Sequence, residues 1–298
     1  MKRGIALLVI ATILWGGNYI CGRFLGPALP STLLNTLRWA ISTVILGGIM
    51  VANKKKPPIF SRWKELATLG FFGVFAFSTL NYWGLRLISA SQAGMISAGI
   101  PVAILLFTPF VLKEHIRVRA WIGTVLSIFG VIVLLLGKHA TSSPGSIFGD
   151  MVIVLSCFAW GLYTVLGKRF GVHMDPLTMT AGAAFYGTIF SAISCIGTVQ
   201  PSMIHMSTNA WLAVLYVSTF ASVGAYFLWN AGVKIVGAGK AAPYINLLPV
   251  WTVVFGLILL HEQVSWVSLA GGAVTIAGAI LASMGGDGAR QSRSHQVA

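Results

Sequence analysis

The sequence alternates between long apolar runs and short breaks that hold nearly all of its charged residues. A helix that crosses a membrane needs ~20 mostly apolar residues, and this chain supplies such runs one after another. The longer breaks contain turn-forming residues, such as Pro57-Pro58 and Ser142-Ser143-Pro144-Gly145. We therefore predict ten membrane-spanning helices, at approximately residues 4–23, 31–52, 65–85, 91–112, 119–137, 149–167, 176–197, 210–232, 240–260 and 265–285.

The composition agrees with this pattern and excludes an ordinary soluble domain. Of 298 residues, 56% are hydrophobic and only 9% are charged, against roughly 25% charged in a typical soluble domain. So few polar residues cannot cover the surface of a soluble protein of this length. The predicted fold class is an all-α membrane protein, with the lipid bilayer as its surroundings.

The basic residues predict the orientation of the chain in the membrane. If the amino terminus lies inside, sixteen of the twenty Lys and Arg residues fall on the inner side and three fall on the outer side, while Arg38 lies within the second span. An excess of Lys and Arg marks the cytoplasmic side, so both termini are predicted to be cytoplasmic. Nucleic acid is not an expected partner despite the net charge of +14, because the basic residues are scattered between apolar runs rather than gathered on one face.

The second half of the chain repeats the first. At a shift of 148, residues 84–134 match residues 232–282 without a gap, and at a shift of 145 Trp15-Gly16 falls on Trp160-Gly161. The gap-free match pairs Pro101 with Pro249, Glu114 with Glu262, Gly123 with Gly271 and Gly130 with Gly278. Each half holds five predicted helices, and because five is odd the second half must enter the membrane inverted. We predict a first repeat over residues 1–140, a second over 146–286, and a cytoplasmic tail over 287–298.

These residues resemble the ten-helix, EamA-type branch of the drug/metabolite transporter superfamily. The resemblance rests on the Trp-Gly pairs of helices one and six, on Leu37-Arg38-Trp39 in helix two, and on a mid-helix proline followed thirteen residues later by a glutamate. It covers nearly the whole chain. It implies export or exchange of small metabolites, amino acids among them, across a bacterial inner membrane. It also implies a central cavity lined mainly by helices one, three, four, six, eight and nine, with five and ten outside.

Pro101 and Pro249 are candidate hinges. Each lies near the centre of its predicted span, where a proline removes a backbone hydrogen bond and kinks the helix. Freed carbonyls at that depth are tolerated where they face protein or a wet cavity. The alternative is a passive packing kink.

Aromatic and amide residues on the inward faces of the predicted helices are candidates for binding substrate. Trp15 and Trp160 lie near mid-span, away from the interface where tryptophan usually sits, whereas anchoring at the interface fits Tyr82 and Tyr226 equally well. A cavity of rings with a few amides and hydroxyls suits a neutral or zwitterionic solute with an apolar side chain. The candidate residues are Trp15, Asn18, Ser78, Tyr82, Met95, Ser97, Trp160, Tyr163, Tyr226, Asn230 and Tyr244.

Charged residues are rare inside the predicted spans. The acidic residues all fall at or beyond span ends, which disfavours a carboxylate proton relay. Glu114 and Glu262 are predicted to be structural. Two roles fit Arg38: a structural one, paired with backbone carbonyls or with Glu262, or contact with an anionic group of the substrate.

The leading hypothesis is therefore a secondary transporter that exports amino acids or similar metabolites by alternating access. Efflux of drugs or lipophilic cations is the alternative. A cation site would favour an acidic residue within the membrane, and the predicted spans have none in their interior. A membrane-embedded enzyme is a remote alternative, since no catalytic motif is present, and neither a cofactor nor a metal is expected. The glycines of helix ten, Gly271, Gly272 and Gly278, either pack internally or form a homodimer face.

Overall fold

The fold was analysed in a computed structural model, which describes residues 1–55, 58–113, 118–136, 145–171, 174–197, 199–200, 203, 205–236 and 242–284. Within these ranges the regular elements are helices, and no strand occurs. The α-helices are α1 (Lys2–Leu25), α2 (Ser31–Ala52), α3 (Trp63–Leu69), α4 (Phe77–Leu87), α5 (Ala90–Ser97), α6 (Ile100–Leu112), α7 (Val118–Leu136), α8 (Gly145–Phe170), α9 (Pro176–Ser194), α10 (Thr208–Thr219), α11 (Ala225–Val236), α13 (Leu247–Leu259) and α14 (Trp266–Met284). Two π-helices, η1 (Gly70–Ala76) and η4 (Phe220–Gly224), and one 3-10 helix, η5 (Ala242–Asn246), join some of them.

Seven helical stretches of the described chain are long and apolar enough to cross a membrane. They are Lys2–Leu25, Ser31–Ala52, Trp63–Leu87, Ala90–Leu112, Ile147–Phe170, Pro176–Ser194 and Thr208–Gly232. Three further helices are also apolar but shorter, at Val118–Leu134, Tyr244–Leu259 and Trp266–Ala282. The all-helical membrane fold predicted from the apolar runs is thus confirmed.

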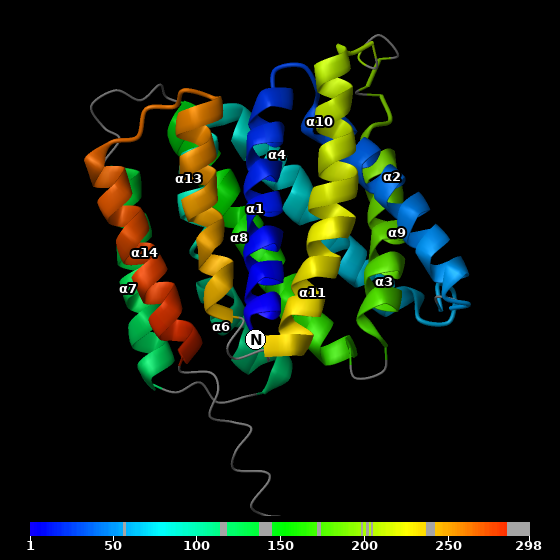
Figure 1. The fold of residues 1–298 in the computed structure, drawn as a ribbon, viewed down its shortest axis with the longest axis horizontal. Coiled ribbons are helices and arrows are strands. Elements are labelled where there is room, and N and C mark those ends of the chain that lie inside the picture. The colour runs from blue at the N-terminus through cyan, green and yellow to red at the C-terminus, as the bar shows by residue number, and fades with distance from the viewer. Residues whose placement is uncertain are drawn as a thin grey trace, which may run out of the picture.

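The helices form a bundle in which the two halves of the chain interlock (Figure 1). α1 packs against α11 and α13 of the second half, while α8 packs against α4 and α6 of the first half. α7 and α14 lie side by side at one edge of the bundle, and α2 and α9 pack together at the opposite edge. Neither half therefore has a core of its own.

The bundle has two distinct ends. Arg23 Nη1 donates to the carbonyls of Leu85 and Arg86, each at 3.0 Å, and Gly149 packs against Leu87. The end of α1, the end of α4 and the start of α8 therefore share one end, which we call the far end. At the other end α1 begins with Lys2 and Arg3 and α8 finishes with Lys168 and Arg169, so we call it the basic end.

α7 and α14 pack as an antiparallel pair through glycine. A Cβ built on Gly130 would lie 2.8 Å from the carbonyl oxygen of Gly271, and one on Gly278 would lie 2.7 Å from the carbonyl oxygen of Gly123. Between them Ser127 Oγ donates to the carbonyl of Thr275 at 3.1 Å. Small residues allow such close backbone approach between membrane helices. The glycines of α14, the tenth predicted span, thus pack internally, and Gly272 contacts Met95. This face therefore does not supply a homodimer surface.

Polar side chains on α2 donate hydrogen bonds to backbone carbonyls in or next to the two π-helices. Asn35, Arg38 and Ser42 are spaced for one helix face and are all buried. Asn35 Nδ2 donates to the carbonyl of Val74 in η1 at 3.1 Å, and Ser42 Oγ donates to the carbonyl of Ser218, just before η4, at 2.8 Å. A π-helix widens the turn and displaces carbonyls from their usual partners, so a bilayer-embedded one needs such donors.

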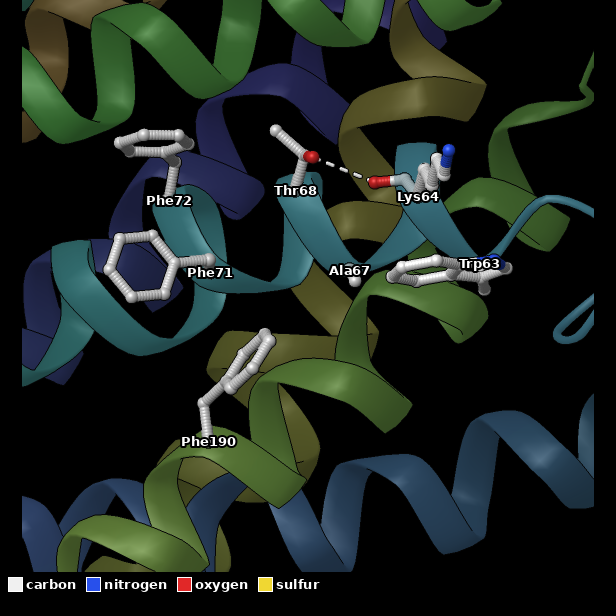
Figure 2. Close-up of a pocket in the computed structure, with 7 residues that line it drawn as sticks. All are labelled: Trp63, Lys64, Ala67, Thr68, Phe71, Phe72 and Phe190. Carbon is white, nitrogen blue, oxygen red and sulfur yellow. Dashed lines mark hydrogen bonds between the residues drawn. The ribbon is translucent and has the colours of Figure 1, made fainter.

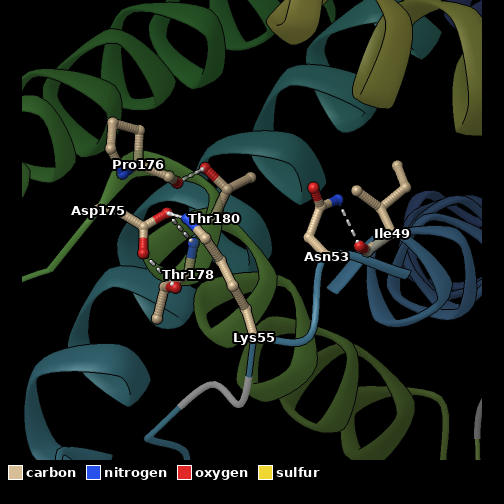
Figure 3. A network of polar contacts seen from close by, with 7 residues as sticks. All are labelled: Ile49, Asn53, Lys55, Asp175, Pro176, Thr178 and Thr180. Atoms are coloured by element: carbon tan, nitrogen blue, oxygen red, sulfur yellow. Dashed lines mark hydrogen bonds and ion pairs between the residues drawn. The ribbon is translucent and has the colours of Figure 1, made fainter. Parts of the chain in front are cut away.

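A polar network ties the end of α2 to the start of α9 (Figure 3). Lys55 Nζ lies 2.9 Å from Asp175 Oδ1, and Asp175 also caps α9 by accepting from Thr178 N at 3.3 Å and Thr178 Oγ1 at 2.6 Å. Burial alone would raise the pKa of Asp175, but the hydrogen bonds from Thr178 and Lys55 outweigh it and lower the pKa below its ordinary value. Because both side chains are more than one-third exposed, this ion pair fixes the connection more than it stabilises the fold.

Candidate functional site

A cavity of about 530 Å³ lies inside the bundle and opens toward the basic end. Its deep wall includes Trp15 and Tyr19 of α1 and Ser97 of α5, in the middle of the bundle. Its mouth includes Lys168, near the end of α8, and Pro176 and Thr180, at the start of α9. A volume of this order suits a small metabolite.

Most of the predicted binding residues meet around this cavity. Eight of the eleven candidates line it, together with both candidate hinges and Arg38: Trp15, Asn18, Ser78, Ser97, Trp160, Tyr163, Tyr226, Asn230, Pro101, Pro249 and Arg38. They come from both halves of the chain, as expected for a site between repeats. The lining also includes residues that we did not predict, among them Tyr19, Trp39, Phe77, Trp229 and Asn246. Asn246 carried a usable signal, since it is an amide within an apolar run.

Two aromatic groups line the cavity, and each combines residues from both halves of the chain. Trp15 packs edge-on against Tyr226, with ring centroids 5.8 Å apart, and lies 5.4 Å from Trp229. Its indole Nε1 donates to the carbonyl of Ala221 in η4 at 3.1 Å, which fixes the ring. The ring of Trp160 is tilted against those of Phe77 and Tyr163, with ring centroids 4.6 and 5.0 Å apart. These rings provide rigid apolar surface for a solute.

The prolines occupy a different position in their helices from the one predicted. α5 ends at Ser97 and α6 begins at Ile100, so Pro101 lies in the first turn of a new helix rather than in the interior of a kinked one. Pro249 likewise lies in the first turn of α13, after the 3-10 helix η5. The backbone N–H groups of a first turn have no acceptor within the helix, so the N–H that proline lacks is not missed there. Both prolines therefore lie where half-helices begin at the cavity wall.

Three of the predicted residues do not line the cavity. Tyr82 is buried behind the wall, where its hydroxyl donates to Asn18 Oδ1 at 2.9 Å. Met95 faces α14, where it contacts Gly272. Tyr244 lies in η5, whose three-residue turn directs its neighbours Ile245 and Asn246 to the cavity instead.

The far end of the cavity is closed by buried hydrogen bonds. Tyr19 Oη lies 2.7 Å from Ser97 Oγ, and Asn81 Nδ2 donates to the Tyr19 hydroxyl at 3.3 Å. Tyr19, Asn81 and Ser97 are each at most 3% exposed. This layer links α1, α4 and α5, so it separates the cavity from the far end.

The charged residues have partners other than those first considered. Arg38 does not pair with Glu262. Arg38 Nε donates to Ser222 Oγ at 2.7 Å and its Nη1 donates to the Tyr82 hydroxyl at 2.9 Å. Asp150, in the first turns of α8, is 2% exposed and accepts a hydrogen bond from Gln92 Nε2. Glu114 lies outside the described residues.

Glu262 caps the amino terminus of α5. Its carboxylate accepts from Ala90 N at 2.7 Å, Ser91 N at 2.9 Å and Ser91 Oγ at 2.6 Å. It therefore connects the segment after α13 to the half-helix that leads to Pro101. The first N–H groups of a helix have no partner within it, so an acceptor from elsewhere stabilises that end.

We expect Glu262→Ala to destabilise the protein by about 1–3 kcal/mol, because it leaves these donors without their acceptor. Thermal unfolding in detergent measures the change. Glu65→Ala is the matched control, since Glu65 only forms a part-exposed ion pair with Arg62 at 3.8 Å and should cost less than about 1 kcal/mol. Equal shifts in the two variants would contradict a capping role for Glu262.

A second hollow, of about 430 Å³, is lined by residues of α3, η1 and α9 and is not a candidate for substrate (Figure 2). Three of its lining residues are phenylalanines, the Lys64 ammonium lies 5.7 Å from the ring centroid of Trp63, and the one hydroxyl, that of Thr68, already donates to the carbonyl of Lys64 at 2.7 Å. It therefore lacks the converging polar groups that orient a small solute.

Comparisons with known proteins agree with this architecture. The model of the EamA-like transporter family matches residues 2–136 and again residues 147–284. The chain is 26% identical to the uncharacterized transporter YetK of Bacillus subtilis, over 91% of this chain and 84% of that one. It is 28% identical to an uncharacterized transporter of Archaeoglobus fulgidus, over 92% of this chain and 95% of that one.

A solved crystal structure is similar in fold, with a TM-score of 0.67 and 21% sequence identity, covering 95% of this chain and 96% of that chain. The relatives named above are transporters rather than enzymes, as predicted. The chain therefore belongs to the EamA-like transporter family of the drug/metabolite transporter superfamily and is a multi-pass membrane transporter.

Proposed function

We propose that this transporter exports or exchanges small metabolites, above all amino acids with aromatic or other apolar side chains, by alternating access in a bacterial inner membrane. One observation carries the proposal: the cavity combines aromatic rings with neutral amides and hydroxyls, at the depth where both halves of the chain meet. Rings suit an apolar side chain, and amides and hydroxyls suit the polar groups of a zwitterion.

The proposal includes ten membrane spans in two inverted repeats, over residues 1–140 and 146–286. Features at equivalent positions of the two halves support it. Lys113 and His261, which are 148 residues apart, both adopt a left-handed conformation, with φ of 56° and 51°. η1 and η4 interrupt the third helix of each half, and a half-helix begins near Pro101 and Pro249. The antiparallel α7–α14 pair is what an inverted repeat requires.

In this topology the basic end is cytoplasmic, and so are both termini and the tail at residues 287–298. The cavity opens to that end, so the described conformation corresponds to an inward-open state. Export then requires the hydrogen bonds of Tyr19, Asn81 and Ser97 to separate while the helices around Lys168 and Pro176 close. The half-helices that begin near Pro101 and Pro249 are suited to such a change, because backbone hydrogen bonding is already interrupted there.

Efflux of lipophilic cations is the second candidate, and the aromatic lining is what favours it. Against it, the described residues that line the cavity include Arg38 and Lys168 but no acidic side chain. A cation would therefore meet like charge without a compensating carboxylate.

Counterflow in proteoliposomes tests the proposed function. Vesicles loaded with one amino acid should take up the labelled form, and a panel of amino acids and one lipophilic cation ranks the two candidates. Thr164→Trp, which narrows the cavity, should reduce uptake at least tenfold, whereas Val44→Trp on the exposed face of α2 should not. The amino acid proposal is wrong if no zwitterion in the panel is taken up.

A further inference from the structure

Arg38 is a buried charge at the wall of the cavity. It is the eighth of the 22 residues of α2, is 6% exposed, and borders the cavity with Trp39. A cation at this depth of a membrane protein is costly unless something compensates its charge. Its position therefore calls for an explanation beyond packing.

Neutral groups hold the guanidinium in place. Ser222 and Tyr82 accept two of its hydrogen bonds, and its Cζ lies 5.1 Å from the ring centroid of Trp39 and 5.7 Å from that of Tyr82. The Tyr82 hydroxyl in turn donates to Asn18. These contacts fix the orientation of Arg38 but leave its charge unbalanced.

No acidic side chain of the described residues pairs with Arg38. Asp175 pairs with Lys55 and Glu65 with Arg62, both outside the cavity. Asp150 accepts from Gln92, and Glu262 caps α5. A buried cation without an anion is strongly unfavourable, whereas a paired one is tolerated.

Hydrogen-bonding capacity points the same way. A guanidinium has five N–H groups, and two of them are engaged by Ser222 and Tyr82. Three remain beside the cavity, with the planar geometry that matches the two oxygens of a carboxylate. Within the cavity lining, Arg38 is also close to the ring of Trp39, and aromatic residues make up much of the remaining wall.

We propose that Arg38 is the subsite for the carboxylate of the substrate, so that the transporter selects solutes that carry a carboxylate and an apolar body. This inference rests on the proposed function and names the group by which that site recognises its solute. The rings of Trp15, Trp160 and Tyr163 receive the apolar body, and the amide oxygens and ring faces receive the ammonium of an amino acid. A lipophilic cation lacks the group that Arg38 binds.

Four ligands of one shape test the proposal: L-phenylalanine, L-phenylalaninamide, phenethylamine and 3-phenylpropionate. Binding is measured by competition in counterflow and by calorimetry on the purified full-length protein. We expect the two carboxylates to bind roughly 10- to 100-fold more tightly than the amide and the amine, as for a charge-assisted hydrogen-bonded pair. Equal binding of the acid and its amide overturns the inference.

Arg38→Gln assigns the selectivity to the residue. This substitution should weaken binding of the two carboxylates by a similar factor and leave binding of the amide and the amine unchanged. The preference for carboxylates then disappears. A merely structural role would weaken all four ligands together. Arg38→Lys should keep part of the preference, because the charge remains and the planar fork is lost.

The series on the unmodified protein decides the matter even if Arg38→Gln does not fold, because the amide and acid differ only at the group in question. Failure of the proposed function looks different from failure of the inference. If no amino acid is transported but 3-phenylpropionate binds in an Arg38-dependent manner, the amino acid proposal fails and the carboxylate subsite stands. If amino acids are transported but the amide competes equally, the reverse holds. Absence of binding by every carboxylate at millimolar concentration also overturns the inference.

Discussion

Gly130→Leu should leave little folded protein, because the leucine side chain has no space between α7 and α14. Even a Cβ at this position would lie 2.6 Å from Thr275 Oγ1 and 2.8 Å from the carbonyl oxygen of Gly271. Overpacking of a core typically costs about 1–3 kcal/mol and more where backbone must move. Fluorescence-detected size-exclusion chromatography and thermal unfolding in detergent measure the loss. Gly278→Leu should behave alike, because a Cβ at Gly278 would lie 2.7 Å from Ser127 Cα.

Gly47→Leu is the matched control for this prediction. Gly47 is exposed on α2, and nothing lies within 4 Å of a Cβ built there. The same substitution then adds an apolar side chain toward lipid and should leave yield and melting temperature nearly unchanged. If Gly130→Leu elutes and melts as Gly47→Leu does, the close packing of α7 on α14 is not what holds them together.

A cysteine in the cavity should react with a membrane-impermeant maleimide from one side of the membrane only. Thr164 lines the cavity, which opens to the basic end. In a background without Cys21, Cys157 and Cys195, Thr164→Cys should be labelled in inside-out vesicles and protected in sealed cells. The expected contrast is nearly all-or-none, because the hydrogen-bonded layer of Tyr19, Asn81 and Ser97 closes the other side.

Asn209→Cys is the control for orientation, since Asn209 is exposed at the start of α10, at the far end. It should be labelled in sealed cells and protected in inside-out vesicles. Reversed labelling of both positions would show that the proposed orientation is wrong. Labelling of both positions in sealed cells would instead show that the cavity opens outward.

The apolar runs were sufficient to predict the helices but not their interruptions. The span predicted at 31–52 coincides with α2, because a run of that length in lipid has few alternatives to a continuous helix. The π-helices at 70–76 and 220–224 escaped prediction, since one extra residue per turn does not alter an apolar run. Those interruptions shift the helix faces that follow them.

The candidate site was predictable where a residue type was unusual for its depth. Trp15 and Trp160 stood out because tryptophan is rare at mid-span, and both line the cavity. The contacts of Tyr82 and Arg38 could not be predicted from the sequence, because their partners in α1 and η4 lie far away along the chain. The buried pair of Asp150 and Gln92 was hidden for the same reason, since the two residues are 58 positions apart.

The pairing of α7 with α14 sets a condition on synthesis of the protein. α7 ends at Leu136, whereas its glycine-matched partner begins only at Trp266 and finishes at Met284. A ribosome adds about 5–20 residues per second, so the first half waits roughly 7–30 s for the helix that covers its glycine face. During that interval the exposed face of α7 must be shielded by lipid or by the insertion machinery. Chains that end early will therefore present it to the membrane's quality-control proteases, however well their first helices have inserted.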